Sequence, residues 1–112
     1  MGRSLPNGTD GDPTDRHAAA VNALRRAVFE SRGSTETAVR DAAGSGGELP
    51  EPLGSYAAKV RDQSYRITDT DFAGLTTAGL SDDAIFEITI AAAVGAALQR
   101  LDAGMRAVRG RA

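Results

Sequence analysis

The segment LSDDAIFEITIAAAVGAALQRL, residues 80–101, constrains the fold of this chain more than any other part of the sequence. Between Ala84 and Gln99 it carries one charge, Glu87, and apolar residues occupy every side of the predicted helix. A helix without a polar face must be buried all round. In a chain of 112 residues, the other helices can hardly enclose it. We therefore expect a second subunit to complete its burial.

Three stripes at helical spacing make up the apolar surface of this segment and of its continuation toward the C-terminus. They comprise Ala84, Glu87, Ala91, Val94, Leu98, Leu101, Met105 and Val108; Ile85, Ile88, Ala92 and Gly95; and Phe86, Ile90, Ala93 and Ala97. The small residues of AAAVGAA (91–97) allow a second backbone to approach closely. The pattern predicts a homo-oligomer that assembles through this helix.

The composition favours an all-α fold. Hydrophobic residues make up 41% of the chain, but aromatic residues only 4%, so the apolar side chains are mainly Ala, Leu and Val. Alanine is the best helix former and a poor strand former. No segment shows a convincing strand pattern. The core must therefore gain its stability from close packing of small side chains between helices.

Capping and turn residues divide the chain into five expected helices, at residues 12–33, 34–44, 50–64, 68–79 and 81–108, with 65–67 as an extended link. The predicted N-caps are Asp12 (followed by Pro13), Ser34, Thr68 (with Asp71 as its capping-box partner) and Ser81. The predicted stops are Gly33, Gly44, Gly79 (with Leu80 in a Schellman ending) and Gly110.

We expect one domain, residues 12–109, between two short tails. Residues 1–11 are rich in Gly, Asn, Asp and Ser and predict a disordered N-terminal tail, and residues 110–112 form a C-terminal tail. The glycines of GSGGE (44–48) predict a flexible connector. A phosphate-binding loop is not expected there, because no strand precedes it.

Charge and residue types exclude several function classes. A net charge of −2 gives no electrostatic case for a nucleic-acid or membrane partner. Residues 72–88 mimic a helix-turn-helix, but residues 67–99 contain five acidic and no basic side chains, which DNA phosphates would repel. The low-charge run is too short to span a bilayer, and residues 1–14 have no apolar signal segment. We expect a soluble, cytoplasmic protein.

Glu87 is the first candidate site residue, since a buried carboxylate is costly unless it is paired or hydrogen-bonded. Two interpretations remain open. In the first, which we favour, Glu87 has a structural partner: an arginine, a tyrosine hydroxyl or free backbone amides. In the second, its pKa is raised and the group takes part in catalysis. Tyr56 and Tyr65 are expected at the edge of the core, where either hydroxyl would suit Glu87.

His17 is the second candidate catalytic residue. It is the only histidine, and it precedes Val21, Leu24 and Val28 on the apolar stripe of the first helix. Histidine is the usual acid–base group near neutral pH, although a lone histidine in a first turn is more often exposed and inactive. With no cysteine and one histidine, the sequence predicts no metal site and no cofactor.

Residues 65–104 resemble the C-terminal half of the AhpD-like and carboxymuconolactone decarboxylase superfamily. The resemblance rests on an ordered set of features: an extended entry ending in Thr68-Asp69, a short helix closed by AGLS (78–81), an acidic start, Ile85 and Glu87, and a small-residue helix with Gln99-Arg100. The segment ESRGSTETAVRDAA (30–43) also resembles, more weakly, the helix–Gly–helix step of that family. The resemblance implies an AhpD-like all-α domain that forms homo-oligomers.

In the peroxidase branch of that superfamily, activity depends on a Cys-x-x-Cys pair. The corresponding segment of this chain reads RHAAAVNALRRAVFESRG, and the chain has no cysteine. Dithiol peroxidase activity is therefore excluded, because no thiolate exists to attack a peroxide. The decarboxylase branch does not need the pair, but its acid–base residues have no recognisable match here.

The sequence thus predicts a cysteine-free, non-redox, AhpD-like protein that acts as a structural or interaction subunit in an oligomer, with a related AhpD-like chain as a further candidate partner. Two alternatives stay open. One is a decarboxylase-like lyase or isomerase that uses Glu87, His17 or a tyrosine in an interhelical pocket. The other is a small-molecule binding protein that uses the same cavity.

Overall fold

The computed structural model describes residues 13–110, and it is all-helical: this range contains five α-helices, one short 3₁₀-helix and no strand. The elements are α2 (Pro13–Phe29), α3 (Thr37–Ser45), α4 (Leu53–Gln63), η1 (Ser64–Arg66), α5 (Asp69–Thr77) and α6 (Asp82–Gly110). The expected all-α class and five-helix count are confirmed for this part. The predicted tail at 1–11, the cap at Asp12 and residues 111–112 lie outside it.

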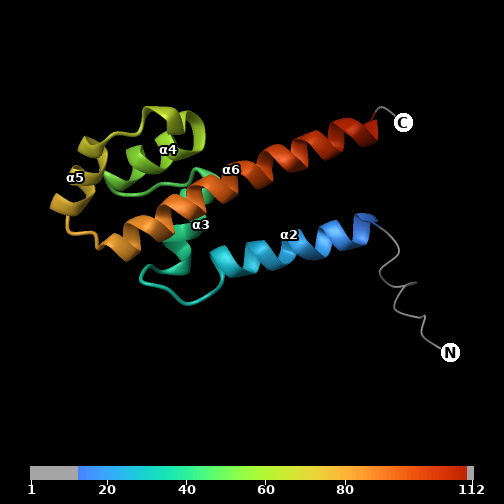
Figure 1. Ribbon diagram of the computed structural model, residues 1–112, viewed down its shortest axis with the longest axis horizontal. Helices are drawn as coiled ribbons and strands as arrows, with labels where there is room; N and C mark the ends of the chain where they lie inside the picture. Colours follow the sequence, from blue (N-terminus) through green and yellow to red (C-terminus); the bar gives the residue numbers. More distant parts are fainter. Residues whose placement is uncertain (1–12, 111–112) are drawn as a thin grey trace.

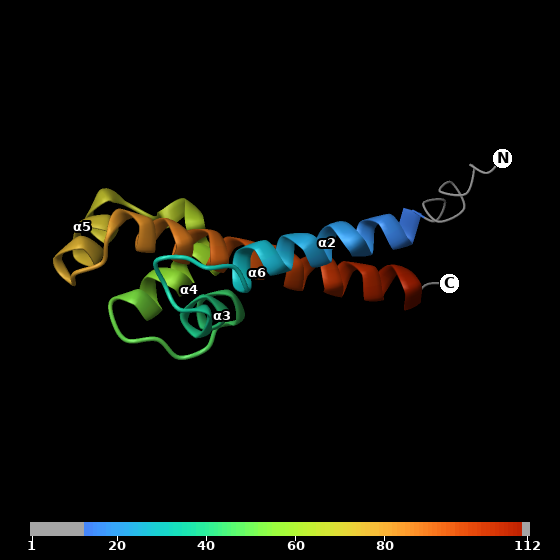
Figure 2. The ribbon, with the colours of Figure 1, turned by 90° about the horizontal axis from the view of Figure 1, so that it is seen from below.

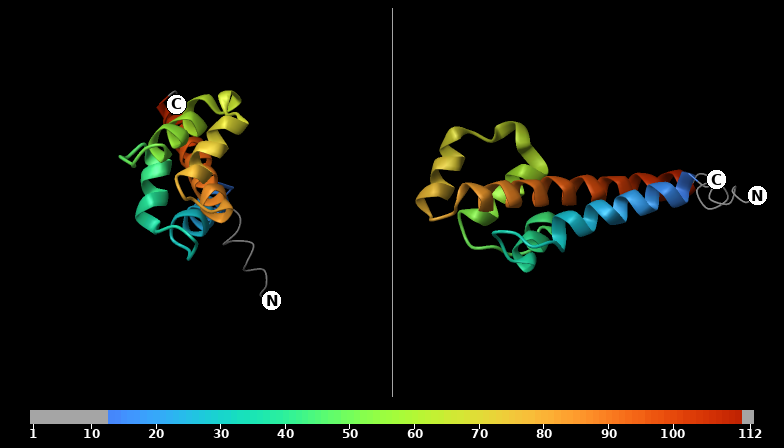
Figure 3. Two further views of the ribbon diagram at one scale, coloured as in Figure 1. Left: turned by 90° about the vertical axis from the view of Figure 1, so that its left-hand side faces the viewer. Right: turned by 60° about the horizontal axis from the view of Figure 1, so that its bottom comes forward.

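The long helix α6 is the axis of the molecule (Figure 1). Helices α3, α4 and α5 gather around its N-terminal half and form what we call the body. Helix α2 runs antiparallel beside the C-terminal part of α6, and the two extend away from the other helices (Figures 2 and 3). We call α2 and the side of α6 that runs beside it, from Phe86 to the C-terminal end, the stem. Two helices side by side enclose much less volume than the body does.

One side of α6 supplies the core of the body. Its buried residues are Ile85, Ile88, Ala91, Ala92, Gly95, Ala96 and Leu98. They include the whole stripe of Ile85, Ile88, Ala92 and Gly95 expected from the sequence, and they pack against α3, α4 and Leu75 of α5. Because many of these side chains are alanine or glycine, the helices lie close together and the core gains energy from dispersion contacts.

Two glycines allow the backbones of α3 and α6 to come into contact in the core. A Cβ atom on Gly95 of α6 would overlap the backbone of Gly44 in α3, and a Cβ atom on Gly44 would lie 2.8 Å from the ring of Phe29. Neither residue has room for a side chain. The two backbones therefore meet directly, and this crossing fixes α3 against α6. Gly44 was expected to end the second helix, but it lies inside α3.

The capping residues predicted from the sequence for α5 and for the start of α6 are confirmed. The N–H of Thr68 donates to the carboxylate of Asp71 at 2.8 Å in a capping box. Gly79 has φ 99°, and the N–H of Leu80 donates to the carbonyl of Leu75 at 3.1 Å, which completes the predicted Schellman ending. The hydroxyl of Ser81 accepts the N–H of Ala84 at 3.1 Å, as expected of an N-cap.

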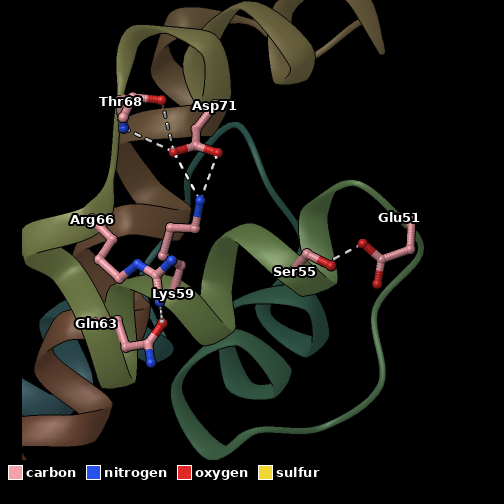
Figure 4. A network of polar contacts seen from close by, with 7 residues as sticks. All are labelled: Glu51, Ser55, Lys59, Gln63, Arg66, Thr68 and Asp71. Atoms are coloured by element: carbon pink, nitrogen blue, oxygen red, sulfur yellow. Dashed lines mark hydrogen bonds and ion pairs between the residues drawn. The ribbon is translucent and has the colours of Figure 1, made fainter.

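An ion pair joins this capped helix to its neighbour. The Lys59 ammonium of α4 lies 2.9 Å from the Asp71 carboxylate of α5 (Figure 4). The N–H of Thr68 and the Lys59 ammonium together lower the pKa of Asp71 below its ordinary value of 3.8. The same carboxylate therefore caps α5 and holds it against α4.

The predicted boundaries between residues 29 and 67 were wrong in several places. Helix α2 ends at Phe29 and does not reach Gly33, and α3 begins at Thr37 with Glu36 as its N-cap, so Ser34 is not a cap. Helix α3 ends at Ser45, and its C-cap is Gly46, which has φ 85°. The reason is tertiary, because residues 30–36 form a loop that α6 holds in place. The link at 65–67 also differs, since a 3₁₀ turn occupies Ser64–Arg66.

The single chain does not bury α6 on every side. Residues 99–110 are all exposed, and Phe86 on the opposite side from the core remains 66% exposed. By length and composition, α6 is also the one helix among residues 13–110 that could cross a membrane, with 33% of its most apolar window buried in the fold. A core helix of a soluble protein meets the same criterion, so this is weak evidence. Assembly with a second subunit stays a prediction.

The glycine crossing gives the first testable prediction. Gly95→Ala places a methyl group into the backbone of Gly44, and we expect it to lower the free energy of unfolding by about 1–3 kcal/mol. Gly74→Ala in α5 is the matched control: its Cβ meets nothing within 4 Å, so helix propensity should raise stability by up to about 1 kcal/mol. Urea titrations followed by circular dichroism measure both. Equal effects of the two substitutions would contradict the close crossing.

Candidate functional site

Glu87 of α6 holds the loop between α2 and α3. Its carboxylate accepts three hydrogen bonds: from the N–H of Ser34 at 2.7 Å, the N–H of Thr35 at 2.8 Å and the hydroxyl of Thr35 at 2.6 Å. Gly33 gives the carboxylate its room, because a Cβ atom there would lie 2.7 Å from both oxygens. Two of the three donors are free backbone amides, one of the options that the sequence left open, and the third is the hydroxyl of Thr35.

Arg40 supports the same loop from the other side. It lies on α3, is only 3% exposed, and donates from Nη2 to the carbonyl of Ser31. Its Nε has no partner within the described part of the chain. The guanidinium also attracts the Glu87 carboxylate electrostatically. A carboxylate on α6 and a guanidinium on α3 thus fix both halves of one loop.

The hydrogen bonds decide the protonation state of Glu87. The hydroxyl of Thr35 and the N–H of Ser34 lower the pKa of Glu87 below its ordinary value of 4.5, although desolvation acts in the opposite direction. Glu87 is therefore ionised at neutral pH, and both of its oxygens are occupied. A general acid or base near neutral pH would need a raised pKa and a free oxygen.

His17 lies far from Glu87. It is exposed on α2, whereas the α2 residues beside Glu87 are Ala27 and Val28. Ten residues of helix separate His17 from Ala27, which corresponds to about 15 Å along the axis. The structure does not bring the two candidate catalytic residues together, and they form no acid–base pair.

The tyrosines do not contact Glu87 either. The hydroxyl of Tyr56 forms a 2.6 Å hydrogen bond with the hydroxyl of Thr89, which in turn donates to the carbonyl of Ile85. Tyr56 is buried, while Tyr65 is 83% exposed and lies away from the core. Both tyrosines were expected at the core edge, but Tyr56 belongs to the buried core and its hydroxyl binds Thr89 of α6, while Tyr65 lies outside the core.

Three open hollows lie beside α2, α3 and the loop between them. One of about 190 Å³ lies between α2 and α6, with Glu87, Arg40, Phe86 and Ile90 among its lining residues. One of about 360 Å³ lies between α2, α3 and α6 and carries charged side chains at its rim. A third, of about 560 Å³, follows the loop at residues 30–37. Within residues 13–110, no group of three or more His, Asp or Glu side chains could hold a metal ion.

The largest unusual feature is an exposed apolar face on the stem. Six large hydrophobic side chains on α2 and α6 are at least 36% exposed, among them Phe86 at 66% and Val108 at 60%. One straight row on α6, together with Ala20, Leu24 and Ala27 on α2, forms what we call the apolar face. The row on α6 comprises Phe86, Ile90, Ala93, Ala97, Leu101, Gly104 and Val108.

The two helices contribute to the same side of the stem. Ala27 lines the 190 Å³ hollow together with Phe86 and Ile90, so that side of α2 borders the row on α6. Ala20 and Leu24 precede Ala27 at helical spacing and share its side of α2. No position of this face carries a charged side chain. An uncharged face of this length is typical of a surface that another protein covers.

Sequence reasoning missed the loop that Glu87 holds. Ser34 and Thr35 were assigned to a helix start, and Arg40 was not recognised as buried. Nothing in the sequence marks backbone amides as the partners of a carboxylate 52 residues away. Comparisons of the chain with protein-family models, curated proteins and solved structures find no match.

The network gives a second prediction. Glu87→Gln keeps the shape of the side chain but replaces one acceptor oxygen by an amide group, which cannot accept the N–H of Ser34 or Thr35. We expect it to lower the free energy of unfolding by about 1–2 kcal/mol, because the site is half-open and water replaces part of the loss. Glu48→Gln, on the exposed connector, is the matched control and should leave stability unchanged. Equal stability of both variants would contradict the structural role.

A third prediction concerns pH. Because folding lowers the pKa of Glu87, its contribution to stability is complete above its unfolded pKa, near 4.5, and is lost as the pH falls through the folded value. The difference in unfolding free energy between the wild type and Glu87→Gln should therefore shrink on acidification below that pH. Chemical denaturation over a pH series measures it. A difference that grows on acidification would indicate a raised pKa instead.

Proposed function

We propose that this protein is a non-catalytic assembly subunit that forms a homo-oligomer through the apolar face of its stem. The observation that carries the proposal is the exposure of that face along α6, with Phe86, Leu101 and Val108 among its large side chains. Leaving such side chains in water gives up about 1.5–3 kcal/mol each relative to full burial. A second protein surface is the simplest source of that burial.

The state of Glu87 supports a structural role over a catalytic one. The carboxylate is ionised, both oxygens accept hydrogen bonds, and His17 lies about 15 Å along α2 from the residues that flank it. A lyase or isomerase that used Glu87 would have to break the bonds that hold the loop at residues 30–36. The hollow beside Glu87 is also bordered by Phe86 and Ile90, which the proposed oligomer would cover.

We also propose a family for this chain and the compartment in which it acts. We assign the chain to a cysteine-free, non-redox branch of the AhpD-like superfamily, on the ordered motifs of residues 65–104. The all-α fold and the observed caps at Thr68, Gly79 and Ser81 are compatible with that assignment. In this proposal the protein acts in the cytoplasm, and a related AhpD-like chain with a similar apolar face is a further candidate partner.

The fourth prediction tests the assembly. Size-exclusion chromatography with light scattering should give a mass that is a multiple of 11.6 kDa. Phe86→Glu puts a charge into the apolar face and should shift the protein to the monomer, while the helix itself is preserved because an acid suits its first turns. Tyr65→Glu changes an even more exposed aromatic residue away from the face and should leave the mass unchanged. A monomeric wild type at high concentration would contradict the proposal.

A further inference from the structure

We propose that two copies of the chain pair through α6 in antiparallel orientation, about a two-fold axis at the level of Gly95, and form a four-helix bundle with their two α2 helices. This inference rests on the proposed homo-oligomer and specifies its partner surface, orientation and register. It follows from the geometry of the row on α6, the distribution of side-chain size along it, and the charges at its ends.

The row on α6 is straight enough to meet a second helix along its whole length. Its members, from Phe86 to Val108, are spaced four, three, four, four, three and four residues apart. Phe86, Ala97 and Val108 are therefore eleven residues apart, which is close to three turns of an α-helix and gives little drift around it. The row spans 22 residues, or about 33 Å.

Two pairs of positions in the row are complementary in size in the antiparallel direction about Gly95, while Ile90, Leu101 and Val108 come to the level of residues outside the row. Phe86 and Gly104 both lie nine residues from Gly95, on opposite sides of it, and Ala93 and Ala97 both lie two residues from it. Pairing about Gly95 places the large exposed ring of Phe86 over Gly104 of the partner subunit. A Cβ atom on Gly104 meets nothing within 4 Å in the single chain, so this position is open to receive the ring.

The charges at the two ends of α6 favour the same direction. The helix begins with Asp82 and Asp83 and carries Arg106 and Arg109 near its end. Antiparallel pairing about Gly95 brings the acidic start of each helix to the basic end of the other. It also places the two helix dipoles antiparallel, so that the positive end of each helix lies beside the negative end of the other. Parallel pairing would place like charges together at both ends.

The second helix of the stem fits this arrangement. Because α2 flanks the row on α6, a two-fold axis perpendicular to both α6 helices also brings the two α2 helices side by side. Leu24, which is 44% exposed, then enters the core of the bundle. Pairing about Gly95 overlaps the two rows over residues 86–104, or about 27 Å, so a face two helices wide, or about 18 Å, covers roughly 490 Å² per copy. The total of about 1,000 Å² lies at the lower end of specific interfaces.

Distances between spin labels test the orientation. The chain has no cysteine, so Gln99→Cys and Ala107→Cys each introduce one labelling site, and both positions lie outside the apolar face. In the antiparallel dimer, the separation along the axis is about 12 Å for position 99 and about 36 Å for position 107, because each residue away from Gly95 adds twice the helical rise. The lateral separation of the labels adds to both distances, so double electron–electron resonance should show a clearly longer distance at position 107 than at position 99, by somewhat less than the axial difference of about 24 Å.

Two outcomes separate this inference from the proposed function. A dimer by light scattering with equal, short distances at both sites would overturn the antiparallel pairing and leave the proposed oligomer standing. A monomer at all concentrations would overturn both. If the monomer instead bound vesicles of anionic phospholipid through α6, the face would serve a lipid surface and the pairing would be wrong.

The register has its own test. Gly104→Leu should not disturb the single chain, where the position is open, but it should weaken dimerisation about ten-fold by overpacking against Phe86 of the partner subunit. Combining it with Phe86→Ala should restore the affinity, because the new side chain fills the space that the ring leaves. Unchanged or tighter pairing by Gly104→Leu alone would overturn the register about Gly95.

Discussion

The apolar circumference of α6 is the constraint on which the rest of this structure depends. One side, with Ile85, Ile88, Ala92 and Gly95, is covered by the three helices of the body, and it allows the backbones of α3 and α6 to touch. The opposite side, with Phe86 and Leu101, has only α2 beside it. The body is therefore complete as a core, whereas the stem has half of the layers that a helical bundle needs.

Glu87 occupies the junction between these two regions. Its carboxylate binds the loop at Ser34 and Thr35, and that loop sets the direction in which α2 leaves the body. With Arg40 bound to the carbonyl of Ser31, the loop is held from α6 and from α3 at once. The one charge within the stretch from Ala84 to Gln99 of α6 thus positions α2 along the stem. This gives a physical reason for a carboxylate there without any chemistry.

Much of the fold could be predicted from local signals, because capping depends on a few neighbouring residues. The capping box at Thr68, the left-handed Gly79 and the cap at Ser81 are all of this kind. Predictions failed where a residue distant in the sequence forms the hydrogen bond that a local cap would otherwise form. Ser34 would be a good N-cap in isolation, but the carboxylate of Glu87 binds its N–H, and α3 begins three residues later, at Thr37.

The candidate site could be predicted only in part, for the same reason. The sequence marks Glu87 as a group that needs a partner, but the identity of that partner depends on how α2 turns into α3. Tyr56 was a reasonable candidate, yet its hydroxyl lies against Thr89, two residues along the same helix. Likewise, apolar stripes show that α6 needs cover on every side, but not which side the chain's own helices provide.

The most direct measurement of the central claim is hydrogen exchange of the backbone amides of residues 99–110 as a function of protein concentration. If a second copy covers the stem, these amides should be protected at high concentration and should exchange faster on dilution, while the amides of the body keep their protection. Exchange in residues 99–110 that is fast and independent of concentration would contradict the account.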